Sequence, residues 1–159
     1  MRRWVTAAAV LAALAASAAF ARDSLGVFND WGAFRDPATA TAPLRCYAIA
    51  QPQSGGAAVR YVTIAYWPNA RVRGQVHVRL ATNARPGTAV TMRLGSQRFT
   101  LVTRGAGAWA SNPQMDAAIV AAIRSSQAMS ASVNGATASW RLRGAATAID
   151  AAALGCARR

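Results

Sequence analysis

The sequence contains no lysine and no glutamate, and it has only one histidine and two cysteines. Any histidine-based catalytic triad must therefore use His77, and a zinc site would find few further ligands. The acidic residues are five aspartates that form no tight sequence pair: Asp23, Asp30, Asp36, Asp116 and Asp150. We therefore expect no catalytic centre, no metal site and no cofactor.

Arginine is the only strongly basic residue, and it gives the chain a formal net charge of +13. A surface of this charge attracts phosphate, lipopolysaccharide or anionic lipid. A codon bias toward GC also favours arginine over lysine, so a purely compositional origin of the charge stays open. The hydrophobic content of 53% excludes a disordered chain and predicts one globular core.

The N-terminus has the pattern of a secretory signal peptide. Two arginines follow Met1, residues 5–20 are almost wholly apolar, and Ala19-Phe20-Ala21 matches the small-x-small cleavage pattern. The apolar run is short for a membrane span and lacks a basic stop-transfer flank. We expect cleavage near Ala21, which leaves residues 22–159 as a single periplasmic or secreted domain without a transmembrane segment.

In an exported chain, two cysteines most often form one disulfide. A bond between Cys46 and Cys156 would close a loop of roughly 110 residues, which stabilises the fold by up to about 4.7 kcal/mol in the chain-entropy model. The alternatives are a metal site shared with His77 or a reactive thiol.

Hydrophobic alternation predicts strands at residues 45–51, 59–67, 74–81, 89–94, 97–102, 128–133 and 136–143. Gly95-Ser96 and Asn134-Gly135 suit two-residue hairpin turns. Asn112-Pro113 predicts a helix start, and a second helix is expected at 147–154, ended by Gly155. No strand is assigned to residues 22–44 or 104–109. We expect Trp31, Trp67, Trp109 and Trp140 in the core, with Trp67 best placed for partial exposure.

Consecutive hairpins of this kind predict a mainly β fold. We expect an antiparallel β-sandwich or open barrel of six to seven strands, with one or two short α-helices.

Outward-facing positions on the predicted strands carry a set of basic and polar side chains. If these strands are neighbours, they form an anion-binding face of Arg73, Gln75, His77, Arg79, Arg93, Arg98, Arg141 and Arg143. Its expected partner is an anionic envelope component, such as lipopolysaccharide or lipid headgroups, or a protein. Nucleic acid is not expected outside the cell. The alternative is a solvated face whose charges prevent edge pairing.

Three segments carry a family likeness: Trp31, the strand from Cys46 to Gln51, and the C-terminal region. That region has a helix from Asp116 to Ile123, a strand pair, and an ending from Leu142 to Ile149. Together they resemble the invasion-associated locus B family of bacterial envelope proteins. The resemblance implies an exported, non-catalytic protein linked by name to host-cell entry, without catalytic residues.

This chain departs from the family pattern at two places. Phe34 stands where members often have a cysteine, and Ala108-Trp109 stands where they carry a cysteine pair. The proposed Cys46–Cys156 bond therefore comes from this chain alone.

The leading hypothesis is a binding module that uses its basic face. The alternatives are a small periplasmic hydrolase that uses His77 with a nearby serine or aspartate, and a structural envelope protein without a specific ligand.

Overall fold

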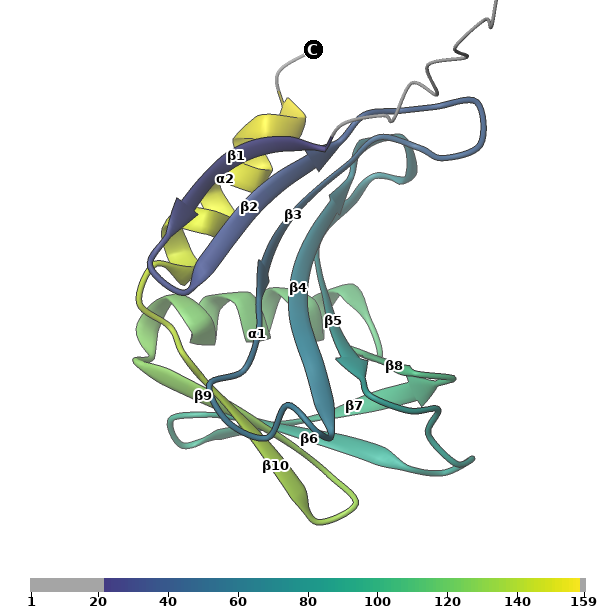
Figure 1. Ribbon diagram of the computed structural model, residues 1–159, viewed down its shortest axis with the longest axis vertical. Helices are drawn as coiled ribbons and strands as arrows, with labels where there is room; N and C mark the ends of the chain where they lie inside the picture. Colours follow the sequence, from purple (N-terminus) through teal and green to yellow (C-terminus); the bar gives the residue numbers. More distant parts are fainter. Residues whose placement is uncertain (1–21, 158–159) are drawn as a thin grey trace, which may run out of the picture.

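The computed structural model describes residues 22–157, so the expected signal peptide at 1–21 lies outside the described residues. The described residues form ten strands and two α-helices (Figure 1). The strands are β1 (Asp23–Phe28), β2 (Trp31–Asp36), β3 (Arg45–Ala50), β4 (Val59–Trp67), β5 (Val72–Leu80), β6 (Ala89–Leu94), β7 (Gln97–Arg104), β8 (Gly107–Trp109), β9 (Ala128–Val133) and β10 (Ala136–Arg141). The helices are α1 (Pro113–Ser125) and α2 (Ala145–Ala157), and a 3-10 turn, η1 (Pro68–Ala70), joins β4 to β5.

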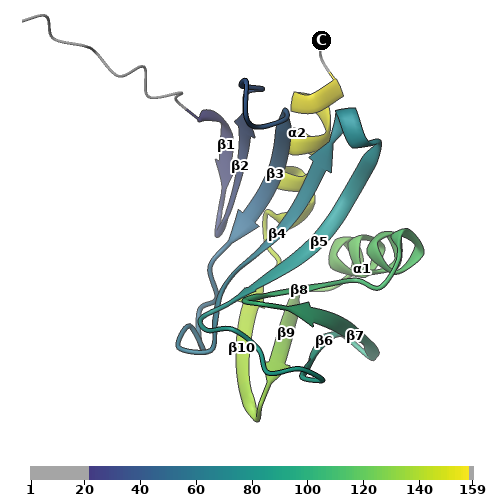
Figure 2. The same cartoon turned by 90° about the vertical axis from the view of Figure 1, so that its right-hand side faces the viewer.

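The strands form one antiparallel sheet in the order β1-β2-β3-β4-β5-β8-β7-β6-β9-β10. The prediction of a mainly β, antiparallel fold is therefore confirmed, with more strands than the expected six or seven. Figure 2 shows the sheet bending between β5 and β8, with α1 beside the bend. The last strand, β10, approaches the loop that follows β3. There the Gln53 amide donates a hydrogen bond to the Ser139 carbonyl at 2.9 Å. The sheet is open, because β1 and β10 do not pair, but this contact curves it into a partly closed barrel.

The two predicted hairpin turns are present. Asn134 and Gly135 both have positive φ, 49° and 80°, as a type I′ turn between β9 and β10 requires. Gly95, with a φ of 59°, opens the turn between β6 and β7.

Strands β1, β2 and β8 were not expected, and each contains a glycine two residues before an aromatic side chain. A Cβ added to Gly26 would lie 2.6 Å from the ring of Phe28, and one added to Gly32 would lie 2.7 Å from that of Phe34. At Gly107 an added Cβ would overlap the indole of Trp109. The ring thus covers the bare glycine backbone, and a glycine that favours a loop is accommodated in a strand.

Helix α1 begins as its sequence predicts. The Asn112 side chain accepts a hydrogen bond from the Met115 amide at 2.8 Å, and Pro113 occupies the first turn. In the same turn, Asp116 Oδ1 accepts from the Val76 amide at 2.8 Å. Because β8 pairs with β5 only at residues 77–79, this carboxylate satisfies a strand amide that β8 leaves free.

Helix α2 is longer than expected, and the prediction that Gly155 ends it is wrong. Gly155 lies inside the helix, where an added Cβ would come 2.5 Å from Leu25 Cδ1. The glycine therefore allows close packing against β1 instead of capping the helix. One residue later, Cys156 forms the disulfide with Cys46 on β3, with the two Cα atoms 5.7 Å apart. The predicted disulfide is present.

Both helices pack on the inner face of the sheet and share one hydrophobic core with it (Figure 1). Trp31 and Trp140 are fully buried in that core, as expected. Neither helix within residues 22–157 has the length and apolar content needed to cross a lipid bilayer.

Candidate binding face

The outer face of the sheet, opposite the helices, carries a group of aromatic side chains. The strand registers place Phe34 opposite Tyr47, and His77 opposite Trp109. Tyr61 shares the outward phase of β4, and Trp67 joins the group because its Nε1 donates to Gln75 Oε1 at 3.2 Å. We call this set the aromatic face: Phe34, Tyr47, Tyr61, Trp67, His77 and Trp109. Tyr47 is buried, and the other five remain partly exposed.

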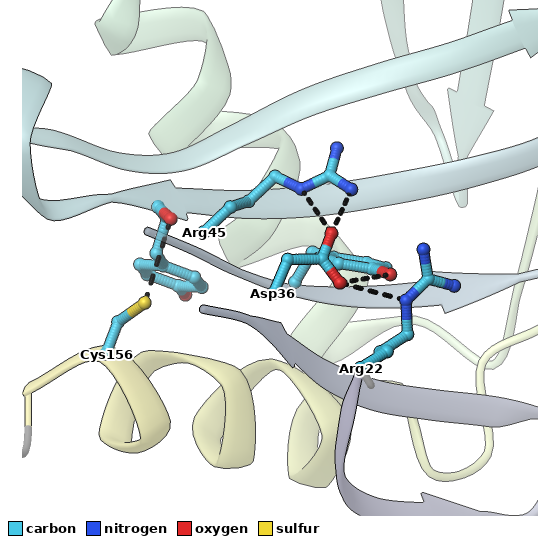
Figure 3. A network of polar contacts seen from close by, with 6 residues as sticks. Arg22, Asp36, Arg45 and Cys156 are labelled. Carbon is cyan, nitrogen blue, oxygen red and sulfur yellow. Dashed lines mark hydrogen bonds and ion pairs between the residues drawn. The ribbon is translucent and has the colours of Figure 1, made fainter. Parts of the chain in front are cut away.

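At one end of the aromatic face, two arginines surround a single carboxylate (Figure 3). Arg22 Nε donates to Asp36 Oδ1 at 2.9 Å, and Arg45 Nε donates to Oδ2 at 3.2 Å. Burial opposes ionisation of Asp36, but the hydrogen bonds from Arg45 and Arg22 outweigh it and hold the pKa of the carboxyl below its ordinary value. Two guanidinium groups against one carboxylate leave this end positively charged.

The same two guanidinium groups lie over aromatic rings. Arg45 is 4.4 Å from the ring centre of Tyr47 and 5.3 Å from that of Trp67. Arg22 lies 5.3 Å from the ring centre of Tyr47 and 5.7 Å from that of Phe34. Cation–π attraction therefore fixes charge directly over the aromatic side chains.

At the other end, His77 lies between two rings. It stacks on Trp109 with centroids 4.8 Å apart and meets Tyr61 edge-on at 6.2 Å. Burial, followed by the charges of Arg79 and Arg45, lowers the pKa of His77 to about 4. The imidazole is therefore neutral at pH 7 and contributes no charge to this face.

Two further arginines flank Trp109. Its indole lies over Gly107, and Gly107 pairs with Arg79 on β5 and with Arg104 on β7. Neither guanidinium forms an ion pair with a carboxylate of residues 22–157. Both side chains are exposed and available to an external anion.

The chain matches no protein-family model, no curated protein and no solved structure in the comparisons. Any ligand of this face must therefore be inferred from its own side chains.

Of the expected anion-binding face, the structure gathers Gln75, His77 and Arg79 beside Trp109. Arg73 is separated from them by an irregularity in the β4–β5 pairing, where Gly74 has a φ of 71°. Arg73 instead lines an open groove of about 880 Å³ between Tyr66 and the last turn of α2.

The other four expected residues lie elsewhere. Arg93 and Arg98 face each other near the end of the β6–β7 hairpin. Arg141 lies on β10, where its Nε is 3.4 Å from Asp30 Oδ2, and Arg143 follows that strand. These four side chains are exposed, but the strand registers do not bring them into contact with the aromatic face.

The sequence patterns did not predict most residues of the aromatic face. The core position expected for Trp109 is wrong, because the indole lies outward on β8 and is partly exposed. Trp67 is also partly exposed, as its place before Pro68 suggested. The sequence does contain a signal for Trp67. Side chains alternate between the two faces of β4, so Trp67 lies on the same face as Tyr61, opposite the core residues Val62 and Ile64.

A hollow of about 460 Å³ opens beside Trp109. Its walls are Gln75, Val102, Thr103, Arg104, Trp109, Ala110 and Ser111. Within residues 22–157, His77 forms no hydrogen bond with a hydroxyl or carboxylate, and no three potential metal ligands are grouped. The side chains that converge here offer stacking, hydrogen bonds and positive charge.

Proposed function

We propose that this chain is an exported, non-catalytic binding protein of the bacterial envelope, and that its aromatic face holds an anionic envelope component. The observation that supports this most directly is an uncovered sheet face on which partly exposed rings alternate with arginines. A guanidinium pairs with phosphate or carboxylate through two parallel hydrogen bonds, and an adjacent ring adds contact area. Because Arg79 and Arg104 have no carboxylate partner among the described residues, an external anion would meet little competition.

Export is part of the same proposal. The basic start and the apolar run before Ala21 support a signal peptide, and the Cys46–Cys156 bond is compatible with an oxidising compartment. We place the protein in the periplasm or outside the cell on these grounds. Membership of the invasion-associated locus B family, with its link to host-cell entry, rests on the short motifs around Trp31, Cys46 and Leu142.

The rival hydrolase would use His77 as a base. That role requires a proton acceptor within reach of a nucleophile, and here the imidazole is held between Tyr61 and Trp109. The stacked position favours recognition over proton transfer.

Binding of purified protein to lipopolysaccharide tests the proposal. We expect affinity to fall at least tenfold between about 50 mM and about 200 mM salt, because charge neutralisation releases counterions. Arg79→Gln and Arg104→Gln should each weaken binding severalfold. Arg143→Gln, which removes an exposed charge outside the aromatic face, is the matched control. Equal effects of all three variants, or no binding at low salt, would contradict the proposed site.

A further inference from the structure

We infer that the anionic component is an acidic polysaccharide, with a sugar ring stacked against Trp109 and acid groups paired with Arg79 and Arg104. This inference rests on the proposed function, because it names the ligand class of the same face.

The arrangement around Gly107 is the first reason. Arg79 and Arg104 lie in register on either side of this glycine, so their backbones are two strand spacings apart, roughly 10 Å. The indole of Trp109 lies over the glycine between them. His77 already stacks on the indole, so a sugar would approach it from the hollow that Trp109 also lines. An aromatic surface with a cation on each side matches a polymer in which rings alternate with negative charges.

The hollow beside Trp109 is the second reason. The oxygen of Gln75 is held by Trp67 Nε1, which leaves the amide N–H groups of Gln75 to donate outward. Ser111 adds a hydroxyl and Arg104 adds N–H donors at the same hollow. Sugar hydroxyls need such donors and acceptors around an apolar ring contact, whereas an acyl chain needs an apolar cavity. Only Val102 and Ala110 supply aliphatic surface beside the indole.

The distribution of exposed apolar side chains is the third reason. The large exposed ones among residues 22–157 are Val27 on β1, Val102 on β7 and Leu154 on α2. They lie on separate elements and form no continuous patch that could insert into a bilayer. His77 stacks on Trp109 as a neutral imidazole, so it positions the indole without adding charge. A polymer in solution therefore fits this face better than a membrane surface does.

The test uses four probes that distinguish recognition of sugar rings, of negative charge and of a lipid surface. Polygalacturonate carries a carboxylate on every sugar, dextran has sugars without charge, polyphosphate has charge without sugars, and phosphatidylglycerol vesicles present a lipid surface. We expect polygalacturonate to bind most tightly and dextran not to bind measurably.

Two substitutions at one position isolate the ring. Trp109→Leu keeps an apolar cover over Gly107 but removes the aromatic surface, whereas Trp109→Phe keeps an aromatic ring. We expect Trp109→Leu to weaken polygalacturonate binding about tenfold and Trp109→Phe to weaken it much less. Polyphosphate binding should change less than twofold in both. Circular dichroism and thermal melting of each variant check that the fold is retained.

The outcomes distinguish this inference from the proposed function. If lipopolysaccharide or vesicles bind through Arg79 while polygalacturonate does not, the inference is wrong and the proposed function stands. The inference also fails if Trp109→Leu affects polyphosphate and polygalacturonate equally. Absence of binding to every anionic probe at low salt would overturn both.

Discussion

Glycine is favoured at some backbone positions for two reasons, a positive φ and close approach of another atom, and this molecule separates them. Gly144 and Gly87 have similar positive φ values, 88° and 80°. At Gly144 an added Cβ would overlap the Phe28 carbonyl, whereas at Gly87 it would meet no atom within 4 Å. Gly87 thus tests conformational strain alone, and Gly144 tests strain together with close approach to β1.

We expect Gly144→Ala to lower the free energy of unfolding by about 3 kcal/mol or more, since left-handed strain of about 1 kcal/mol is added to a backbone clash. Gly87→Ala should cost only about 1 kcal/mol. Urea unfolding of both variants measures the difference. Equal losses would show that the contact between Gly144 and Phe28 does not constrain the fold.

The neutral state of His77 links stability to pH. Its folded-state pKa, about 4, lies below the ordinary value of 6.5, so the unfolded chain takes up a proton first as the pH falls. The stabilising contribution is therefore complete above about pH 6.5 and is lost progressively toward about pH 4.

We expect the single imidazole resonance of the chain to titrate by NMR with a midpoint near 4. The stability difference between wild type and His77→Gln should shrink as the pH falls from about 7 to about 5. A midpoint near 6.5 would contradict the partly buried, stacked position of the imidazole.

Residue patterns explain which parts of the site were predictable. The alternation of Gln75, His77 and Arg79 with valines placed these three side chains on the outer face correctly. Their aromatic neighbours were missed because hydrophobicity alone assigns tryptophan to the core. The side of the sheet that the helices cover is decided by tertiary packing, and no local pattern around Trp109 records it.

At the scale of elements, strong periodicity or specific turn residues made strands and helices predictable. The β9–β10 hairpin followed from Asn134-Gly135, and the start of α1 followed from Asn112-Pro113. Strands β1, β2 and β8 were not recognised because glycine interrupts each one. Their shared signal, glycine two residues before an aromatic, has meaning only once the ring is seen to cover the backbone.

The disulfide matters most for α2, the last element of the described chain. Helix α2 packs across β1, β2 and β3, and Cys156 holds its final turn to β3 across a separation of 110 residues. The covalent bond therefore keeps the segment that forms α2 close to the segment that forms β3 even in the unfolded chain.

We expect the double variant Cys46→Ser/Cys156→Ser to lose about 2–5 kcal/mol of stability under oxidising conditions. Under strong reductant, wild type and the variant should unfold at similar denaturant concentrations. Hydrogen exchange in the variant should accelerate in α2 more than in α1. Equal stability of the two proteins without reductant would show that the bond does not stabilise the fold.

At the scale of the whole molecule, positive charge is spread well beyond the aromatic face. Arg93 and Arg98 stand directly opposite each other on β6 and β7, and like charges in that position oppose folding by roughly 0.2–1 kcal/mol. With a formal net charge of +13, the folded chain is also subject to general self-repulsion.

We expect the free energy of unfolding at pH 7 to rise by about 1 kcal/mol as sodium chloride increases from about 10 mM to about 150 mM, because salt screens this repulsion. Arg98→Glu converts the opposed pair into an attractive one, so its stability should respond less to salt. A wild-type stability that falls with salt would mean that the ion pairs outweigh the repulsion.

The cysteine content has a consequence for how the protein is produced. With two thiols in the chain, only one intramolecular pairing exists, and it is the one that joins β3 to α2. Incorrect oxidation can only join separate molecules. The yield of native protein refolded from fully reduced material should therefore depend on protein concentration. A disulfide isomerase should not raise this yield, because no incorrectly paired monomer can form.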